Sequence, residues 1–184
     1  MAASPQKRST GVVARFPATK APALHPVIAV KLWENPCWFS FRINYLALQF
    51  NVPIYGWIER RYGLMRPEYV VLYSLFLKDG ITANDICQSS GFPKNTLSRA
   101  IQKLLRRRLI RRAADPLDRR RYGLRLTAEG RRIVDETLPA MLERERQMLA
   151  NLNQDEQQVL TELLARLVLD SPTWPAHVEQ EDSP

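Results

Sequence analysis

Residues 82–130 read TANDICQSSGFPKNTLSRAIQKLLRRRLIRRAADPLDRRRYGLRLTAEG. Thr82, followed three residues later by an acidic side chain, is typical of a helix N-terminus, and Gly91 predicts the end of that short helix. Pro93 suits the start of a second helix, because its missing amide hydrogen costs nothing in the first turn. Two short helices joined by a tight glycine turn are the pattern of a helix-turn-helix.

The second of these helices has two chemically different faces. Apolar side chains recur on one face at helical spacing, at Leu97, Ala100, Ile101, Leu104 and Leu105. The opposite face is polar and basic, with Asn95, Arg99, Gln102, Lys103 and Arg106, flanked by Thr96 and Ser98. We expect the first face to be buried and the second to point outward.

A cationic hairpin is predicted after the second helix. The pieces IRRAA and YGLRLT are short and strand-like, and a turn signal at residues 115–118 separates them. Three consecutive arginines at residues 119–121 follow this turn, so the hairpin tip and its returning edge are basic. A hairpin in this position is called a wing.

The charge of the chain is concentrated in this region. The 184 residues carry a formal net charge of +8, with twelve basic and two acidic side chains in residues 91–125, and five basic and twelve acidic ones in residues 126–184. Such asymmetry indicates a polyanion that meets one part of the molecule. A solvated arginine-rich helix face is the alternative.

Further helices are expected on both sides. A helix over residues 37–62 should be kinked or divided by Pro53, and a buried helix should run from Pro67 to Gly80. A long helix that Pro139 bends should follow Thr127, and a final helix carries an apolar stripe at Val159, Leu160, Leu163, Leu164, Leu167 and Val168. A single winged domain cannot fully bury these stripes, so we expect a second copy to cover them; packing within one chain is the alternative.

Several function classes are disfavoured. The longest apolar run, residues 69–77, is about half of the ~20 residues that a membrane-spanning helix needs, and the N-terminus does not resemble a secretory signal, so we expect a cytoplasmic protein without a membrane partner. Two cysteines are too few for a disulfide framework or a cysteine-ligated zinc site. No nucleophile–base pairing, phosphate loop or metal-ligand cluster is visible, so we expect neither an enzyme nor a cofactor.

The run over residues 82–130 resembles the winged helix-turn-helix of the multiple-antibiotic-resistance regulator (MarR) family. The most specific part is the wing, with Asp118, Arg119 and Arg120 followed by the spaced Leu124, Leu126, Thr127 and Gly130. With the flanking helices, the resemblance covers roughly residues 37–170. Arg108 departs from the family, which usually has glycine there; it predicts either a different helix cap or a left-handed backbone costing ~1 kcal/mol or more.

The resemblance implies a mainly α fold with a small β wing, in a homodimeric bacterial transcription regulator. Such regulators are often repressors that bind a pseudo-palindromic operator in double-stranded DNA and release it when a small molecule binds. The implied division is a flexible basic arm (residues 1–30), dimerisation and effector-pocket helices (31–66), a winged helix-turn-helix domain (67–130), C-terminal dimerisation helices (131–170) and a tail (171–184).

The same resemblance assigns the DNA contacts. Residues 94–103 would lie in the major groove, and the wing arginine Arg120, oriented by Asp118, would enter the minor groove. The expected DNA-binding residues are Lys94, Asn95, Thr96, Ser98, Arg99, Gln102, Lys103, Arg111, Arg119, Arg120 and Arg121. Arg112 would join the backbone contacts, and Arg106 and Arg107 would either be solvated or neutralise the acidic C-terminal helix.

An effector pocket is expected between the dimer helices and the winged domain, for an aromatic carboxylate or a phenolic compound. The candidate lining residues are Trp38, Phe39, Arg42, Tyr45, Trp57 and Tyr69, with Arg42 as the cation for a carboxylate. Aromatic side chains at helical spacing are also what a core requires, and Arg42 could pair with an acid across the dimer. Other hypotheses are redox sensing through Cys37, a basic RNA-binding protein, and an architectural DNA-binding dimer without a ligand.

Overall fold

The computed structural model describes residues 25–114 and 122–175. In this part of the chain the helices are α1 (Pro26–Trp33), α2 (Trp38–Tyr62), α3 (Arg66–Leu77), α4 (Ala83–Ser90), α5 (Lys94–Arg106), α6 (Ala128–Leu149) and α7 (Gln154–Asp170), and a 3₁₀ turn spans Ser171–Thr173. Strands β1 (Ile110–Ala114) and β2 (Tyr122–Leu126) form one antiparallel sheet. The chain divides into two compact units at Leu48, within α2. The fold is therefore mainly helical with a small wing, as the sequence predicts.

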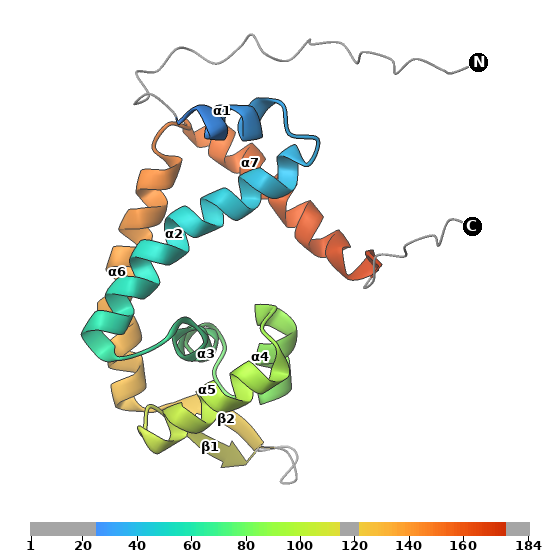
Figure 1. The fold of residues 1–184 in the computed structure, drawn as a ribbon. Coiled ribbons are helices and arrows are strands. Elements are labelled where there is room, and N and C mark those ends of the chain that lie inside the picture. The colour runs from blue at the N-terminus through green and yellow to red at the C-terminus, as the bar shows by residue number, and fades with distance from the viewer. Residues whose placement is uncertain (1–24, 115–121, 176–184) are drawn as a thin grey trace, which may run out of the picture. The chain divides into compact units, whose positions relative to one another are not determined.

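The core of the second unit lies where α3, α5, α6 and the wing meet (Figure 1). Helix α3 is apolar on most of its surface, and its Tyr69, Val71, Leu72 and Leu75 are fully buried. The side chains packed around α3 come from α2, α4, α5 and α6, and include Ile58, Ile86, Leu97, Leu104 and Val134. Burial of apolar area is the main stabilising term here.

Local sequence signals position the helix-turn-helix. The hydroxyl of Thr82 accepts a hydrogen bond from the amide of Asp85 at 3.2 Å, and the Asp85 carboxylate accepts one from the amide of Thr82 at 2.8 Å. This capping box begins α4, and Gly91 ends it with a left-handed backbone (φ +69°). Pro93 precedes the first residue of α5. The expected start and end of α4 are confirmed, and α5 starts directly after Pro93 as expected.

The wing is attached to the turn that follows α3. Its two strands pair Arg111 with Arg125 and Arg112 with Leu124. The amide of Leu124 donates to the carbonyl of Ile81 at 2.8 Å, and the Leu124 carbonyl accepts from the amide of Gly80 at 2.9 Å. The expected hairpin tip, residues 115–121, lies outside the described residues. The roles expected for Asp118, Arg119, Arg120 and Arg121 therefore stay predictions.

Pro53 does not divide α2, which is helical from Trp38 to Tyr62. Because proline has no amide hydrogen, the carbonyl of Gln49 loses its usual helical donor. The guanidinium of Arg144 on α6 replaces it, since Nε and Nη2 donate to the Gln49 carbonyl oxygen at 3.0 and 2.6 Å. The predicted division is therefore wrong, and the reason is a tertiary contact that the local sequence does not reveal. Helix α6 likewise includes Pro139 in its interior.

Helix α1 begins inside the segment that we assigned to the N-terminal arm. Pro26 is its first residue, and the imidazole Nδ1 of His25 accepts a hydrogen bond from the amide of Val27 at 3.3 Å. A side-chain acceptor before a proline at the first helical position is a favourable helix start. Helix α1 therefore overlaps the last five residues of the segment expected to be an arm, residues 26–30. No helix in the described residues is long and apolar enough to cross a bilayer.

Candidate nucleic-acid interface

Helix α5 presents the polar face that the sequence predicts. It buries Leu97, Ala100, Ile101 and Leu104 against the rest of its unit, and Leu105 is partly buried. The exposed side chains on its other face are Lys94, Asn95, Ser98, Arg99, Gln102 and Arg106, while Thr96 is half-buried. The Asn95 carbonyl oxygen accepts a hydrogen bond from the amide of Thr96 at 2.8 Å, which orients the side-chain amide at the start of the helix.

Lys103, on the same helix, forms an ion pair with α3. Its ammonium lies 2.8 Å from a carboxylate oxygen of Glu68, whose side chain is only 8% exposed. The second oxygen of Glu68 accepts from the amide of Met65 at 2.9 Å, at the start of α3. Lys103, whose side chain is 39% exposed, is thus an ion-pair partner that holds α5 against α3, and its expected DNA contact stays a prediction. The only sequence signal for this pair was one acidic side chain inside an otherwise apolar helix.

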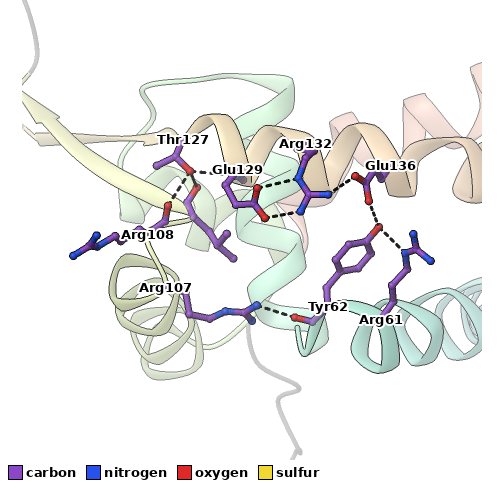
Figure 2. A network of polar contacts seen from close by, with 10 residues as sticks. Arg61, Tyr62, Arg107, Arg108, Thr127, Glu129, Arg132 and Glu136 are labelled. Atoms are coloured by element: carbon purple, nitrogen blue, oxygen red, sulfur yellow. Dashed lines mark hydrogen bonds and ion pairs between the residues drawn. The ribbon is translucent and has the colours of Figure 1, made fainter.

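Arg107 is also engaged inside the unit. Its guanidinium donates to the carbonyl oxygens of Tyr62 at 2.8 Å and Gly63 at 3.1 Å, at the C-terminal end of α2 (Figure 2). A cation is favourable there, because the last carbonyl groups of a helix have no intrahelical donors. Arg107 is exposed, which agrees with the solvated alternative, and its hydrogen bonds to the end of α2 were not expected. The residue links the end of α5 to the end of α2.

Arg108 resolves the question of how α5 ends. It has a left-handed backbone, with φ +56°. Its amide donates to the Leu105 carbonyl and the amide of Leu109 donates to the Leu104 carbonyl, both at 3.0 Å. These two bonds form a Schellman motif, which normally has glycine at the position of Arg108. The chain therefore keeps the glycine-type cap and accepts the strain of an arginine in it.

Thr127 holds the strained backbone from the other side. Its hydroxyl lies 2.9 Å from the carbonyl oxygen of Arg108 and 3.0 Å from that of Leu109, and it accepts from the amide of Gly130 at 3.1 Å. A Cβ on Gly130 would lie 2.1 Å from the Leu109 carbonyl oxygen, so only glycine allows α6 to start this close to the wing. A strained residue persists where its surroundings fix it in this way.

A chain of polar contacts continues from α2 to α6. The hydroxyl of Tyr62 donates to Glu136 at 2.8 Å, and Arg132 contacts both Glu136 and Glu129 (Figure 2). The hydrogen bond from Tyr62, together with those from Arg132, lowers the pKa of Glu136. Burial and the bond to Glu136 raise the pKa of Tyr62. The end of α2 is thus tied to α6 through Tyr62 and to α5 through Arg107.

The arginines of β1 differ from the one on β2. Arg111 and Arg112 are exposed, and neither forms an ion pair with a described residue. Arg125, directly opposite Arg111, lies 3.0 Å from the carboxylate of Asp79 and is therefore neutralised. Strand β1 therefore presents uncompensated positive charge close to the exposed face of α5.

The expected effector residues are divided between the two units, four in the first and two in the second. Trp38 and Phe39 are exposed, and Tyr45 is half-buried beside Phe41, with ring centroids 5.6 Å apart. The guanidinium of Arg42 lies over the rings of Trp33 and Trp38, at 5.7 and 5.2 Å, and donates to the carbonyls of Leu32 and Trp38. In the second unit, Trp57 is half-buried and makes an edge contact with Tyr62.

Tyr69 is a core residue and offers no surface to an effector. It is 0% exposed, and its hydroxyl lies 2.6 Å from the hydroxyl of Thr137 and 3.2 Å from the sulfur of Met141. Burial raises the pKa of its phenol to about 12. The aromatic side chains were expected either to line a pocket or to pack in a core, and Tyr69 packs in the core.

The cysteines provide no built site. Cys37 is exposed, and its amide donates to the side chain of Asn35 at 2.9 Å, while Cys87 is half-buried against the core. Within residues 25–114 and 122–175, no group of three or more His, Cys, Asp or Glu side chains could hold a metal ion.

A polar recognition helix, a preceding helix across a glycine turn and a two-stranded wing define a winged helix-turn-helix DNA-binding protein. The model of the MarR family matches residues 62–121. The regulator HosA of Escherichia coli O111:H- is 29% identical over 112 residues, which cover 61% of this chain and 83% of HosA. Residues 62–121, which include most of the winged helix-turn-helix, therefore match the MarR family of transcriptional regulators.

Two solved structures share this fold. A MarR/EmrR family transcriptional regulator from Acinetobacter sp. ADP1 matches with a TM-score of 0.66 and 23% identity, over 73% of this chain and 95% of that one. BpsR of Bordetella bronchiseptica, whose DNA binding is regulated by 6-hydroxynicotinic acid, matches with a TM-score of 0.57 and 25% identity, over 70% of this chain and 98% of its own.

Proposed function

We propose that this protein is a homodimeric repressor that binds a pseudo-palindromic operator and is released by a small aromatic carboxylate or phenol. The single observation that carries the proposal is the outward face of α5, where Ser98, Arg99 and Gln102 are exposed while the opposite face is anchored in the core. Arginine can bind guanine through two hydrogen bonds, and glutamine can do the same with adenine. The hydroxyl of Ser98 suits a phosphate contact.

The exposed apolar side chains support a dimer. On α7, Val159, Leu163, Leu167 and Val168 are 38–70% exposed. Burying one such side chain fully is worth about 1.5–3 kcal/mol, so a second copy that covers the stripe would gain substantially. We propose that residues 31–66 and 131–170 form this interface. A two-fold dimer presents two recognition helices, which is why an inverted repeat is the expected operator.

Arg42 is the proposed anchor for the effector carboxylate. Two of its nitrogens already donate to backbone carbonyls, and a guanidinium has five N–H donors, so donors remain for an acid. The rings of Trp33 and Trp38 beside it can stack on an aromatic ligand. The regulation of BpsR by 6-hydroxynicotinic acid, an aromatic acid, supports this ligand class. The other residues proposed to line the effector site are Trp38, Phe39, Tyr45 and Trp57. Tyr69 is not among them, because it is fully buried.

Release requires that effector binding favours a dimer whose recognition helices no longer match the operator spacing. The link from α2 to α5 through Arg107 gives a displacement of α2 a direct route to the DNA-reading face. By linkage, DNA must weaken effector binding by the same factor as the effector weakens DNA binding.

The DNA-reading role is tested by selecting binding sites from a random duplex library and measuring affinity for the recovered sequence. We expect an inverted repeat with half-sites one helical turn or a multiple of it apart, and a loss of at least tenfold with Arg99→Ala at unchanged dimer mass in sedimentation. Equal binding to structured RNA, or a monomer at working concentration, would refute the proposal.

The effector is tested with 6-hydroxynicotinic acid and benzoate, with phenol as the uncharged comparison. We expect the acids to raise the melting temperature of the free protein and to release DNA, and Arg42→Ala to abolish both effects without weakening DNA binding. An acid response that survives in Arg42→Ala removes this residue from the pocket. If neither the acids nor phenol has an effect, the architectural role without a ligand is favoured.

A further inference from the structure

A hollow opens beside the C-terminal end of α5. It has a volume of about 570 Å³ and is lined by side chains from α5, from β1 and from the start of α6, including Gln102, Arg108, Arg111, Arg112 and Thr127. With Leu105 and Ile110 the lining comprises seven residues, of which three are arginines. We refer to this feature as the cationic hollow.

The charge of the cationic hollow is not neutralised within the described residues. Neither an ion pair nor a side-chain hydrogen bond engages the guanidinium groups of Arg108, Arg111 and Arg112 there, whereas Arg107 and Arg125 on either side are both engaged. Figure 2 shows the Arg108 side chain extending away from the polar network around Tyr62 and Glu136. Several guanidinium groups around one hollow repel each other, so an anion between them is favourable.

The backbone of Arg108 gives an independent reason to expect a ligand. Its φ of +56° is a conformation that glycine adopts without strain, and the Schellman bonds and Thr127 hold it there. The backbone role alone would be better served by glycine. What an arginine adds is its guanidinium at the edge of the hollow. Strained residues of this kind are found where the side chain has a function.

The position of the hollow indicates which anion it binds. Gln102 belongs both to the outward face of α5, with Ser98 and Arg99, and to the lining of the hollow. The face proposed to read base pairs therefore continues directly into the hollow. An arginine fork matches the two free oxygens of a phosphate, and an open hollow admits a phosphate that is still linked to its sugars.

We propose that the cationic hollow binds a backbone phosphate of the DNA that α5 reads, with Arg108 as its principal cation. This inference rests on the proposed function and adds to it a phosphate site outside the groove-reading residues. The Thr127 hydroxyl is used by the backbone of Arg108 and Leu109, and Gln102 is assigned to the base pairs, so the donors to phosphate are the three arginines.

The test uses Arg108→Gly in the full-length protein, because glycine suits the backbone and removes only the side chain. DNA affinity is measured between 50 and 200 mM salt. We expect the slope of log K against log salt to become less steep by about 1.8, the value for two phosphate contacts, because the proposed dimer carries two copies of Arg108. We also expect a melting temperature that is equal to or higher than that of the parent. Arg108→Lys should retain most of the slope, because it keeps the positive charge.

Two controls separate the possible failures. Lys78→Ala, at the end of α3, removes the same charge at an exposed site that is assigned neither to DNA binding nor to the dimer interface, and its slope should equal that of the parent. Arg99→Ala reports on the recognition helix itself. If Arg99→Ala weakens binding but Arg108→Gly leaves both affinity and slope unchanged, the phosphate site is refuted and the proposed function stands. If neither variant weakens DNA binding, the proposed DNA-binding role of α5 is refuted, and the phosphate site with it.

A free anion is the remaining alternative occupant. Inorganic phosphate is titrated into the DNA-free protein while its melting temperature is followed. If phosphate raises the melting temperature of the parent and not of Arg108→Gly, while the DNA slope of the variant is unchanged, the hollow holds a free anion and the DNA-phosphate proposal is overturned. A less steep dependence of DNA affinity on salt in Arg108→Gly supports the DNA-phosphate proposal.

Discussion

The contact between Arg144 and the Gln49 carbonyl predicts that two positions 91 residues apart, Pro53 and Arg144, are energetically coupled. The carbonyl loses its helical donor because of Pro53 and receives two guanidinium N–H groups instead, at 3.0 and 2.6 Å. In Arg144→Ala, only water can donate a hydrogen bond to the Gln49 carbonyl. In Pro53→Ala the new amide hydrogen restores the helical bond, so the loss of Arg144 should then matter much less.

The magnitude follows from the geometry. Hydrogen bonds to a charged group contribute about 1.5–3 kcal/mol when buried. Gln49 is exposed and Arg144 is half-buried, so solvent screening reduces the expected cost of Arg144→Ala to about 1 kcal/mol. In the Pro53→Ala background this cost should fall to a few tenths of a kcal/mol, which gives a coupling energy of about 0.7 kcal/mol or more.

The assay is urea unfolding of the four proteins of the double-mutant cycle, at one protein concentration because a dimer's stability depends on it. Arg146→Ala is the matched control, because Arg146 lies on the same helix and pairs with the exposed Glu143 rather than with a backbone carbonyl. It should leave the coupling to Pro53 at zero. Equal costs of Arg144→Ala in both backgrounds would show that Arg144 does not substitute for the missing amide.

Three further predictions concern the core around the DNA-reading helix. Lys103→Met should lower the free energy of unfolding by about 1–2 kcal/mol, because it leaves the buried carboxylate of Glu68 unpaired, and thermal unfolding that shows no loss would contradict this. Tyr69 keeps its proton more tightly in the folded state, with its pKa raised from 10.0 to about 12, so stability should fall as the pH rises through this window. Tyr69→Phe should remove that fall, and an identical alkaline profile would oppose the assignment. Gly130→Ala should destabilise by about 1–3 kcal/mol, since its Cβ would lie 2.1 Å from the Leu109 carbonyl oxygen, and a melting temperature equal to the parent's would show that α6 can shift away.

Local signals were sufficient for the order and type of the elements from α2 onward, but they did not predict α1. The capping box at Thr82, the glycine at position 91 and the proline at position 93 each act through the backbone of their own neighbours, so they specify the same structure in any context. The two faces of α5 follow from helical periodicity for the same reason. The concentration of basic residues in 91–125 indicated a polyanion before any coordinate was considered.

The tertiary structure alone decided what each charged or aromatic side chain does. Lys103, Arg107 and Arg144 are ordinary exposed-type residues by sequence, yet each is engaged by a group at least 35 positions away along the chain. Tyr69 has the same helical spacing as a pocket aromatic, and only its neighbours Thr137 and Met141 make it a core residue. The physical reason is the distance along the chain over which each effect acts. Backbone conformation depends mainly on adjacent residues. The partner of a long side chain is instead the donor, acceptor or charge that the fold brings within about 3 Å, wherever it lies in the sequence.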